Sequence, residues 1–291
     1  MTCPGELVRI DDTSLWVVRR GPTGGHPVIV LHGGPGLDHH MFGDYLDPLA
    51  ERFRLLLVDQ RSQGRSERAP EHTWTLERMA QDVIMLARAL RLERYAVLGH
   101  SYGAFVALQN AVDYPGMAAQ TIVSSGLPST RYLDAVERNL ATFEPVSLRQ
   151  QVTASWESEA EAKTQEDVAS LLHDQLPFQF ADALDTRIAV YERRSAGAEF
   201  APDVLRRFAT SDYGGIEVED RLDDIASPVL VLAGRFDRTC VPEAAEAMAQ
   251  TIPRSQLHVF ERSGHMTFVE QNQDYLRVVG DFLAGTEPVS R

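Results

Sequence analysis

The sequence has very few lysines and no long apolar run. Lys163 is the only lysine among 291 residues, so nearly all of the 28 basic residues are arginines. The net charge of −14 argues against nucleic acid or an anionic membrane surface as a partner. No stretch approaches the ~18 apolar residues that cross a bilayer, and no signal segment is visible. We therefore expect a cytoplasmic protein.

Cysteine is also scarce. Cys3 and Cys240 lie too far apart in the chain to indicate a disulfide framework or the spacing of a metal site. The apolar fraction of 44% and the charged fraction of 24% are ordinary for a globular protein with a large core. We expect no metal or organic cofactor, and the sequence leaves the oligomeric state open.

Short apolar runs alternate with helical segments in the N-terminal half. In the helix expected at 76–90, apolar residues recur at helical spacing, from Leu76 and Met79 to Leu90. Such alternation is typical of a mostly parallel sheet flanked by helices, the α/β class. Strands are expected at 15–20, 27–31, 53–58, 95–98, 120–123, 228–234 and 256–260, and further helices at 102–112, 244–251 and 275–283.

The middle of the chain has a different texture. Between 127 and 222 helical segments dominate, acidic residues are frequent, and no buried strand stands out. A strong strand then returns at 228–234. We predict a core in two parts, 1–126 and 223–291, interrupted by a helical cap at 127–222.

A serine lies between two glycines where a strand becomes a helix. The sequence from Gly99 to Gly103 reads Gly-His-Ser-Tyr-Gly. This pattern in this context is typical of a nucleophile elbow, a turn so tight that side chains at the glycine positions would collide with neighbouring elements. The turn presents the hydroxyl of Ser101 above the sheet, at the N-terminus of the next helix.

A nucleophilic serine needs a base, and the base needs an acid that orients it. Asp237 follows the strand at 228–234, and His265 follows the strand at 256–260. Parallel strands bring both loops to the same sheet edge as Ser101, in the chain order Ser, Asp, His. His258, inside a strand, and His173, in the insertion, are weaker candidates for the base.

Acyl transfer also needs donors for the oxyanion. The backbone N–H of Tyr102, directly after the serine, is one. The loop His-Gly-Gly-Pro-Gly at 32–36 supplies the other, for which we favour Gly34 over Gly33. We expect His32 and Arg61 to brace loops rather than to react.

These motifs together resemble those of the α/β-hydrolases, and more narrowly the prolyl aminopeptidases (proline iminopeptidases). The similarity covers the core on both sides of the insertion. The matching segments are 32–36, 59–66, 99–103, 234–237 and 263–265. Of these, the segments at 32–36 and 59–66 are the most particular to the prolyl aminopeptidases.

The resemblance implies glutamates in the cap that bind the free α-amino group of the substrate. Ser-Trp-Glu at 155–157 is similar to one such site, which makes Glu157 the expected amine anchor, with Trp156 beside it. The family's second glutamate falls at Ala189 in this chain, and Glu192 is near but out of register. The resemblance also places Cys240 in the substrate pocket. Phe42, Tyr45 and Trp156 are candidates to line a ring-sized pocket.

The sequence therefore predicts a serine hydrolase that acts on a small molecule or a short peptide. The first hypothesis is an aminopeptidase that releases N-terminal proline or another small residue. The alternative is an esterase, lactonase or amidase for substrates without a free amine, which Ala189 favours. A non-catalytic receptor with the same fold is the third, and Ser101, Asp237 and His265 argue against it.

Overall fold

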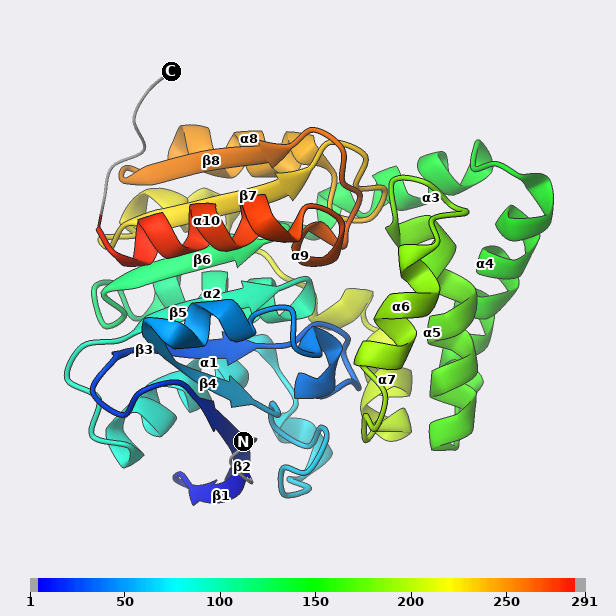
Figure 1. Ribbon diagram of the computed structural model, residues 1–291. Coiled ribbons are helices and arrows are strands. Elements are labelled where there is room, and N and C mark those ends of the chain that lie inside the picture. The colour runs from blue at the N-terminus through cyan, green and yellow to red at the C-terminus, as the bar shows by residue number, and fades with distance from the viewer. Residues whose placement is uncertain (1–4, 286–291) are drawn as a thin grey trace.

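A computed structural model describes residues 5–285, which are built around an eight-stranded sheet (Figure 1). The strand order is β1-β2-β4-β3-β5-β6-β7-β8. β2 pairs antiparallel with β1 and β4, and all other neighbours are parallel. The strands are β1 (Glu6–Arg9), β2 (Ser14–Arg20), β3 (His26–Leu31), β4 (Phe53–Val58), β5 (Ala96–His100), β6 (Gln120–Ser124), β7 (Val229–Gly234) and β8 (Ser255–Phe260).

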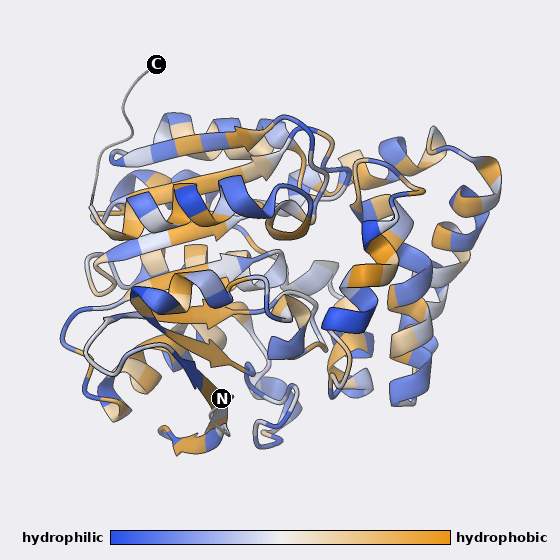
Figure 2. Ribbon diagram, in the orientation of Figure 1, coloured by the Kyte–Doolittle hydropathy of each residue, from blue (hydrophilic) through white to orange (hydrophobic). Residues whose placement is uncertain are grey.

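Helices cover both faces of the sheet, which is why the central strands are apolar on both sides (Figure 2). Successive strand residues point to opposite faces. In β5, Val97 joins the cluster with α1 (Leu76–Ala89), α2 (Tyr102–Asp113) and α8 (Pro242–Thr251). Leu98 joins the cluster with α10 (Asn272–Leu283) on the other face.

Every predicted strand and helix overlaps an observed one. The largest difference is in α10, which begins three residues before the predicted position 275. The prediction missed β1, whose four residues are mostly exposed and carry two charges, so that no apolar run marks it. Cys3 lies outside the described residues.

A helical segment separates β6 from β7, as the sequence predicts, and lies beyond the C-terminal ends of the strands (Figure 1). It has a small core of its own, built from Phe143, Val152 and Phe178. Its helices are α3 (Asp134–Ala141), α4 (Val146–Ser158), α5 (Gln165–Gln179), α6 (Arg187–Arg194) and α7 (Pro202–Ala209).

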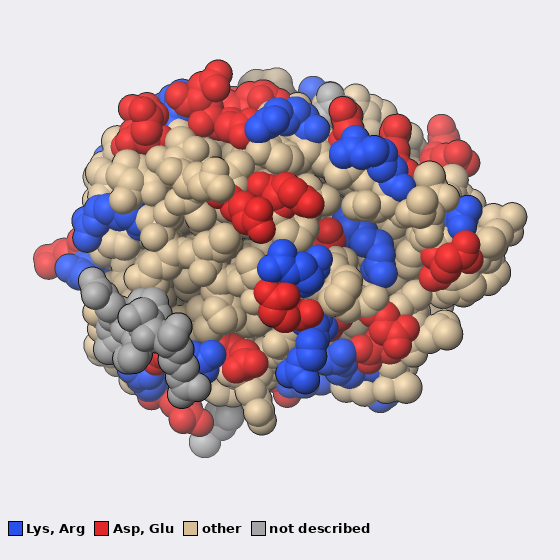
Figure 3. All heavy atoms as spheres, turned by 90° about the horizontal axis from the view of Figure 1, so that it is seen from above, with Lys and Arg blue, Asp and Glu red and all other residues tan. Residues whose placement is uncertain are grey.

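Surface charge is mixed rather than segregated on the face shown in Figure 3, where acidic and basic side chains are interspersed. In the part of the chain that the structure describes, no helix is both long and apolar enough to span a membrane.

Candidate active site

Ser101 occupies the tight turn between β5 and α2. Its backbone has φ 54° and ψ −122°, a strained conformation for a residue other than glycine. The flanking glycines are required by sterics. A Cβ on Gly99 would lie 2.0 Å from the carbonyl oxygen of Gly103, and one on Gly103 would lie 2.3 Å from that of Leu31. The turn has the geometry expected from the Gly-x-Ser-x-Gly spacing.

Asp237 and His265 meet at the same edge of the sheet, from the loops after β7 and β8. The Nδ1 atom of His265 lies 2.8 Å from Oδ2 of Asp237, and both side chains are buried. The other carboxylate oxygen accepts bonds of 2.9 Å from the backbone and hydroxyl of Thr239 and from the backbone of Cys240. A proton on Nδ1 facing this carboxylate leaves the Nε2 lone pair of His265 free to act as a base.

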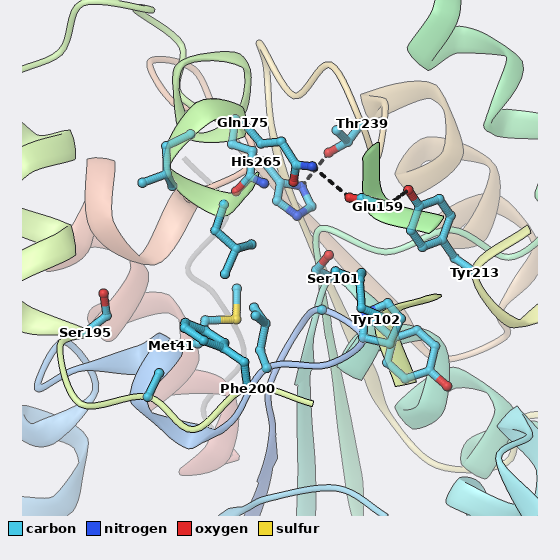
Figure 4. A pocket seen from close by; sticks show the side chains of 18 of the residues that line it. Met41, Ser101, Tyr102, Glu159, Gln175, Ser195, Phe200, Tyr213, Thr239 and His265 are labelled. Atoms are coloured by element: carbon cyan, nitrogen blue, oxygen red, sulfur yellow. Dashed lines mark hydrogen bonds between the residues drawn. The ribbon is translucent and has the colours of Figure 1, made fainter. Parts of the chain in front are cut away.

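Ser101 and His265 line a cavity of about 680 Å³ between the sheet edge and the helical segment. Figure 4 shows both side chains at this cavity, with Met41 and Phe200 on one side and Glu159 and Tyr213 on another. The structure thus brings Ser101, Asp237 and His265 to one site.

Gly34 and Tyr102 also line this cavity. Within residues 5–285, neither of their backbone N–H groups has a hydrogen-bond partner. The N–H of Gly33, by contrast, donates to the sulfur of Met41 at 3.0 Å. This difference favours Gly34 over Gly33 as an oxyanion donor.

The structure does not place Glu157 in the cavity. Trp156 lines it, but Glu157 is exposed on α4. Neighbouring residues of a helix point about 100° apart, so the two side chains face different ways. The carboxylate that does line the cavity is Glu159, in the 3₁₀ turn Glu159–Glu161 that follows α4.

Glu159 is 4% exposed and has two neutral partners. One carboxylate oxygen accepts a bond of 2.7 Å from Nε2 of Gln175, and the other accepts one of 2.7 Å from the hydroxyl of Tyr213. Burial raises the pKa of Glu159, and the two hydrogen bonds oppose this shift. No arginine, lysine or histidine among the described residues pairs with it.

Ala189 is exposed on α6 and does not line the cavity. Glu192, three residues further along the helix, does line it and bonds to Nδ1 of His173. That bond raises the pKa of His173. Although Ala189 supplies no carboxylate, both Glu159 and Glu192 line the cavity. Cys240 lines the cavity as the resemblance implies, and burial raises the pKa of its thiol.

Other residues singled out in the sequence lie outside the cavity. His32 is fully buried, with Nδ1 2.7 Å from the carbonyl oxygen of Gly33. Arg61 is also buried and donates to Asp82. Phe42 and Tyr45 are packed in the core instead of lining the cavity.

Within residues 5–285, two clusters hold enough donor atoms for a metal ion. One is Asp237, Cys240 and His265; the other is Asp38, His39 and His40. In the second cluster, Nδ1 of His40 already lies 2.9 Å from a carboxylate oxygen of Asp38. In both clusters the carboxylates and imidazoles form hydrogen bonds with other side chains: Asp237 with His265, Asp38 with His40, and His39 with Asp59.

The fold and this site define an α/β-hydrolase. The family model described as the alpha/beta hydrolase fold matches residues 26–271, and the chain belongs to this family. Proline iminopeptidases are among its relatives. That of Heyndrickxia coagulans is 31% identical over 269 residues, covering 89% of this chain and 91% of the relative. That of Clostridioides difficile (strain 630) is 31% identical over 291 residues, covering 92% of each.

Solved structures share the fold. The proline iminopeptidase of Mycobacterium smegmatis superimposes with a TM-score of 0.74 at 24% identity, covering 97% of this chain and 98% of its own. An esterase from Exiguobacterium antarcticum gives a TM-score of 0.76 at 24% identity, covering 96% and 99%.

Proposed function

We propose that the protein is a serine hydrolase that works through an acyl-enzyme. His265 removes the proton from the hydroxyl of Ser101 as its oxygen attacks the substrate carbonyl. Asp237 holds the imidazole in the reactive tautomer and stabilises the imidazolium that forms. The 2.8 Å contact between His265 and Asp237, next to a strained serine in the same cavity, supports these roles.

The backbone N–H groups of Gly34 and Tyr102 stabilise the oxyanion. His265 then donates its proton to the leaving group, which departs and leaves the acyl group on Ser101. A water molecule, deprotonated by His265, releases the acyl product and restores the serine.

For the substrate, we propose an N-terminal residue of a peptide, proline or another small one. The observation that carries this proposal is Glu159, a buried carboxylate in the cavity without a cationic partner among the described residues. Burying an unpaired charge is unfavourable, and the ammonium group of a substrate would supply the missing partner. Holding that ammonium fixes the distance to the carbonyl that Ser101 attacks. The named activity of the relatives agrees with this choice.

A second candidate is the hydrolysis of small esters, lactones or amides that lack a free amine. Gln175 and Tyr213 already satisfy both oxygens of Glu159, and burial favours its neutral form. With a neutral Glu159, a mostly apolar cavity suits an uncharged substrate.

The two candidates differ in their response to acetylation of the substrate. We would assay prolyl-β-naphthylamide, its N-acetylated form and p-nitrophenyl acetate, with Ser101→Ala as the blank. An aminopeptidase cleaves the free amine and not the acetylated amide. Turnover of the ester or of the acetylated amide, without a preference for the free amine, would establish the second candidate, and no turnover above the blank would reject both.

A further inference from the structure

The C-terminal end of α5 is held by both loops that carry the proposed acid and base. α5 belongs to the helical segment, and its residues Gln175 and Gln179 line the cavity. The chain from 178 to 181, where α5 ends, lies against the loops of Asp237 and His265. We call residues 178–181 the docking segment.

Arg238, next to Asp237 in the chain, makes the first set of contacts. Its guanidinium donates to three carbonyl oxygens of the docking segment: those of Phe178 at 3.1 Å, Phe180 at 2.6 Å and Ala181 at 3.0 Å. A helix end exposes unpaired carbonyl groups that carry partial negative charge, so a half-buried arginine binds there favourably. The guanidinium also lies 5.0 Å from the ring centroid of Phe143 in the same helical segment.

The loop of His265 and the short helix α9 (Thr267–Glu270) that follows it make the second set. The backbone N–H of His265 donates to the carbonyl oxygen of Gln179 at 2.7 Å. The carboxylate of Glu270 accepts from the N–H of Gly264 at 2.7 Å and from the N–H of Ala181 at 2.9 Å. One buried side chain thus joins the residue before His265 to the docking segment.

The two backbones touch so closely that Gly264 has no room for a side chain. A Cβ at this position would lie 2.5 Å from the carbonyl oxygen of Gln179 and 2.7 Å from the nitrogen of Ala181. The loop of His265 and the docking segment therefore pack in direct backbone contact.

We infer that Arg238 and Glu270 are positioning residues, which fix His265 and Asp237 by fastening the docking segment to their two loops. This inference rests on the proposed roles of the triad. It makes the reactivity of Ser101 depend on how α5 is seated, although neither residue touches the reacting atoms.

The chain offers a matched control. Arg235 and Glu261 also join the loops after β7 and β8, through bonds of 2.8 and 3.0 Å, but this ion pair is exposed and makes no contact with the docking segment. Variants of this pair remove an equal charge near the same two loops without removing a contact of the docking segment.

The test measures how fast a fluorophosphonate labels Ser101 and how fast p-nitrophenyl acetate turns over. The test variants are Arg238→Gln, Arg238→Lys and Glu270→Gln, and the control variants are Arg235→Gln and Glu261→Gln. Because small misplacements of reacting groups slow catalysis, we expect labelling and kcat to fall ~10- to 100-fold in the two glutamine variants of Arg238 and Glu270, with KM changed less than ~3-fold. Arg238→Lys keeps part of the rate, and the control pair keeps the wild-type rate. Wild-type labelling rates in Arg238→Gln and Glu270→Gln would overturn the inference. An unlabelled wild-type enzyme would instead reject the proposed function.

Hydrogen exchange on the wild-type protein gives a second test that needs no variant. The amides of Ala181, Gly264 and His265 should open together, with one shared opening free energy. Fast exchange at Ala181 beside protected Gly264 and His265 would overturn the inference, even if the substituted proteins fail to fold.

Discussion

The hydroxyl of Tyr213 donates a 2.7 Å hydrogen bond to Glu159, 54 residues earlier in the chain. Both residues line the cavity that contains Ser101. Through this bond, Tyr213 stabilises the charged form of a carboxylate whose burial favours the neutral form. Whether Glu159 is charged decides whether the cavity attracts an ammonium group or a neutral substrate.

Tyr213→Phe should weaken the binding of free-amine substrates. Loss of the bond raises the pKa of Glu159 further, because the hydroxyl no longer stabilises the charged form. We expect KM for prolyl-β-naphthylamide to rise ~3- to 10-fold, the effect of losing one ordinary hydrogen bond, and to rise less as the pH is raised. KM for p-nitrophenyl acetate should change little. An equal rise in both KM values at every pH would contradict this role.

Asp237→Asn should nearly abolish turnover while leaving the fold intact. The amide holds the imidazole of His265 in the wrong tautomer, and kcat should fall ~10³- to 10⁴-fold. Thr239→Val removes one of the three donors to the other carboxylate oxygen and should have a much smaller effect. Thermal unfolding checks the fold. A loss below about tenfold in Asp237→Asn would show that Asp237 does not orient the base.

Glu270 should make the stability of the protein fall as the pH rises. Burial raises its pKa from 4.5 to about 7, so between these values the folded protein binds a proton that the unfolded chain has lost. Stability from this group is complete below pH 4.5 and lost as the pH passes about 7. Arg187 and Asp185, the nearby charges, stay ionised across this window.

Urea unfolding of the wild type and of Glu270→Gln isolates this effect, because glutamine does not titrate. The free energy of unfolding of the wild type, minus that of the variant, should decrease by about 2–3 kcal/mol between about pH 4.5 and 7.5. A difference that is constant or increases with pH would refute the raised pKa.

Gly264→Ala should destabilise the protein and slow it. The new methyl group would meet the carbonyl oxygen of Gln179 at 2.5 Å. Overpacking against backbone costs about 1–3 kcal/mol, which lowers Tm by about 2–4 °C per kcal/mol. Gly24→Ala is the control, since no atom lies within 4 Å of the place its methyl group would take. Equal Tm values for the two variants would contradict the close fit of the docking segment.

The sheet and the turn of Ser101 follow from local signals in the sequence. Apolar runs mark the central strands, and glycines at 99 and 103 mark a turn where side chains do not fit. Because parallel strands end at one edge, the positions of Asp237 and His265 after their strands predict that the two residues lie close together. The structure shows this contact.

The substrate-binding residues, by contrast, could not be predicted from local patterns in the sequence. Glu157, Glu159 and Glu161 alternate along an acidic stretch, and nothing local tells which of them faces inward. The end of α4 at Ser158 decides this, because the chain then turns and directs Glu159 into the cavity. The hydrogen bond of Arg238 to Phe178 joins residues 60 positions apart, so the local sequence around neither residue predicts it.

The most direct measurement of the central claim is amine selectivity, the ratio of kcat/KM for prolyl-β-naphthylamide to that for its N-acetylated form. We would compare the wild type, Glu159→Gln and Glu157→Gln. Glu159→Gln should lower kcat/KM for the free amine by about tenfold to a hundredfold, since a bond to a charged group contributes about 1.5–3 kcal/mol. The exposed Glu157 should leave the ratio unchanged. A ratio that is the same in Glu159→Gln as in the wild type, or that falls only in Glu157→Gln, would contradict the account.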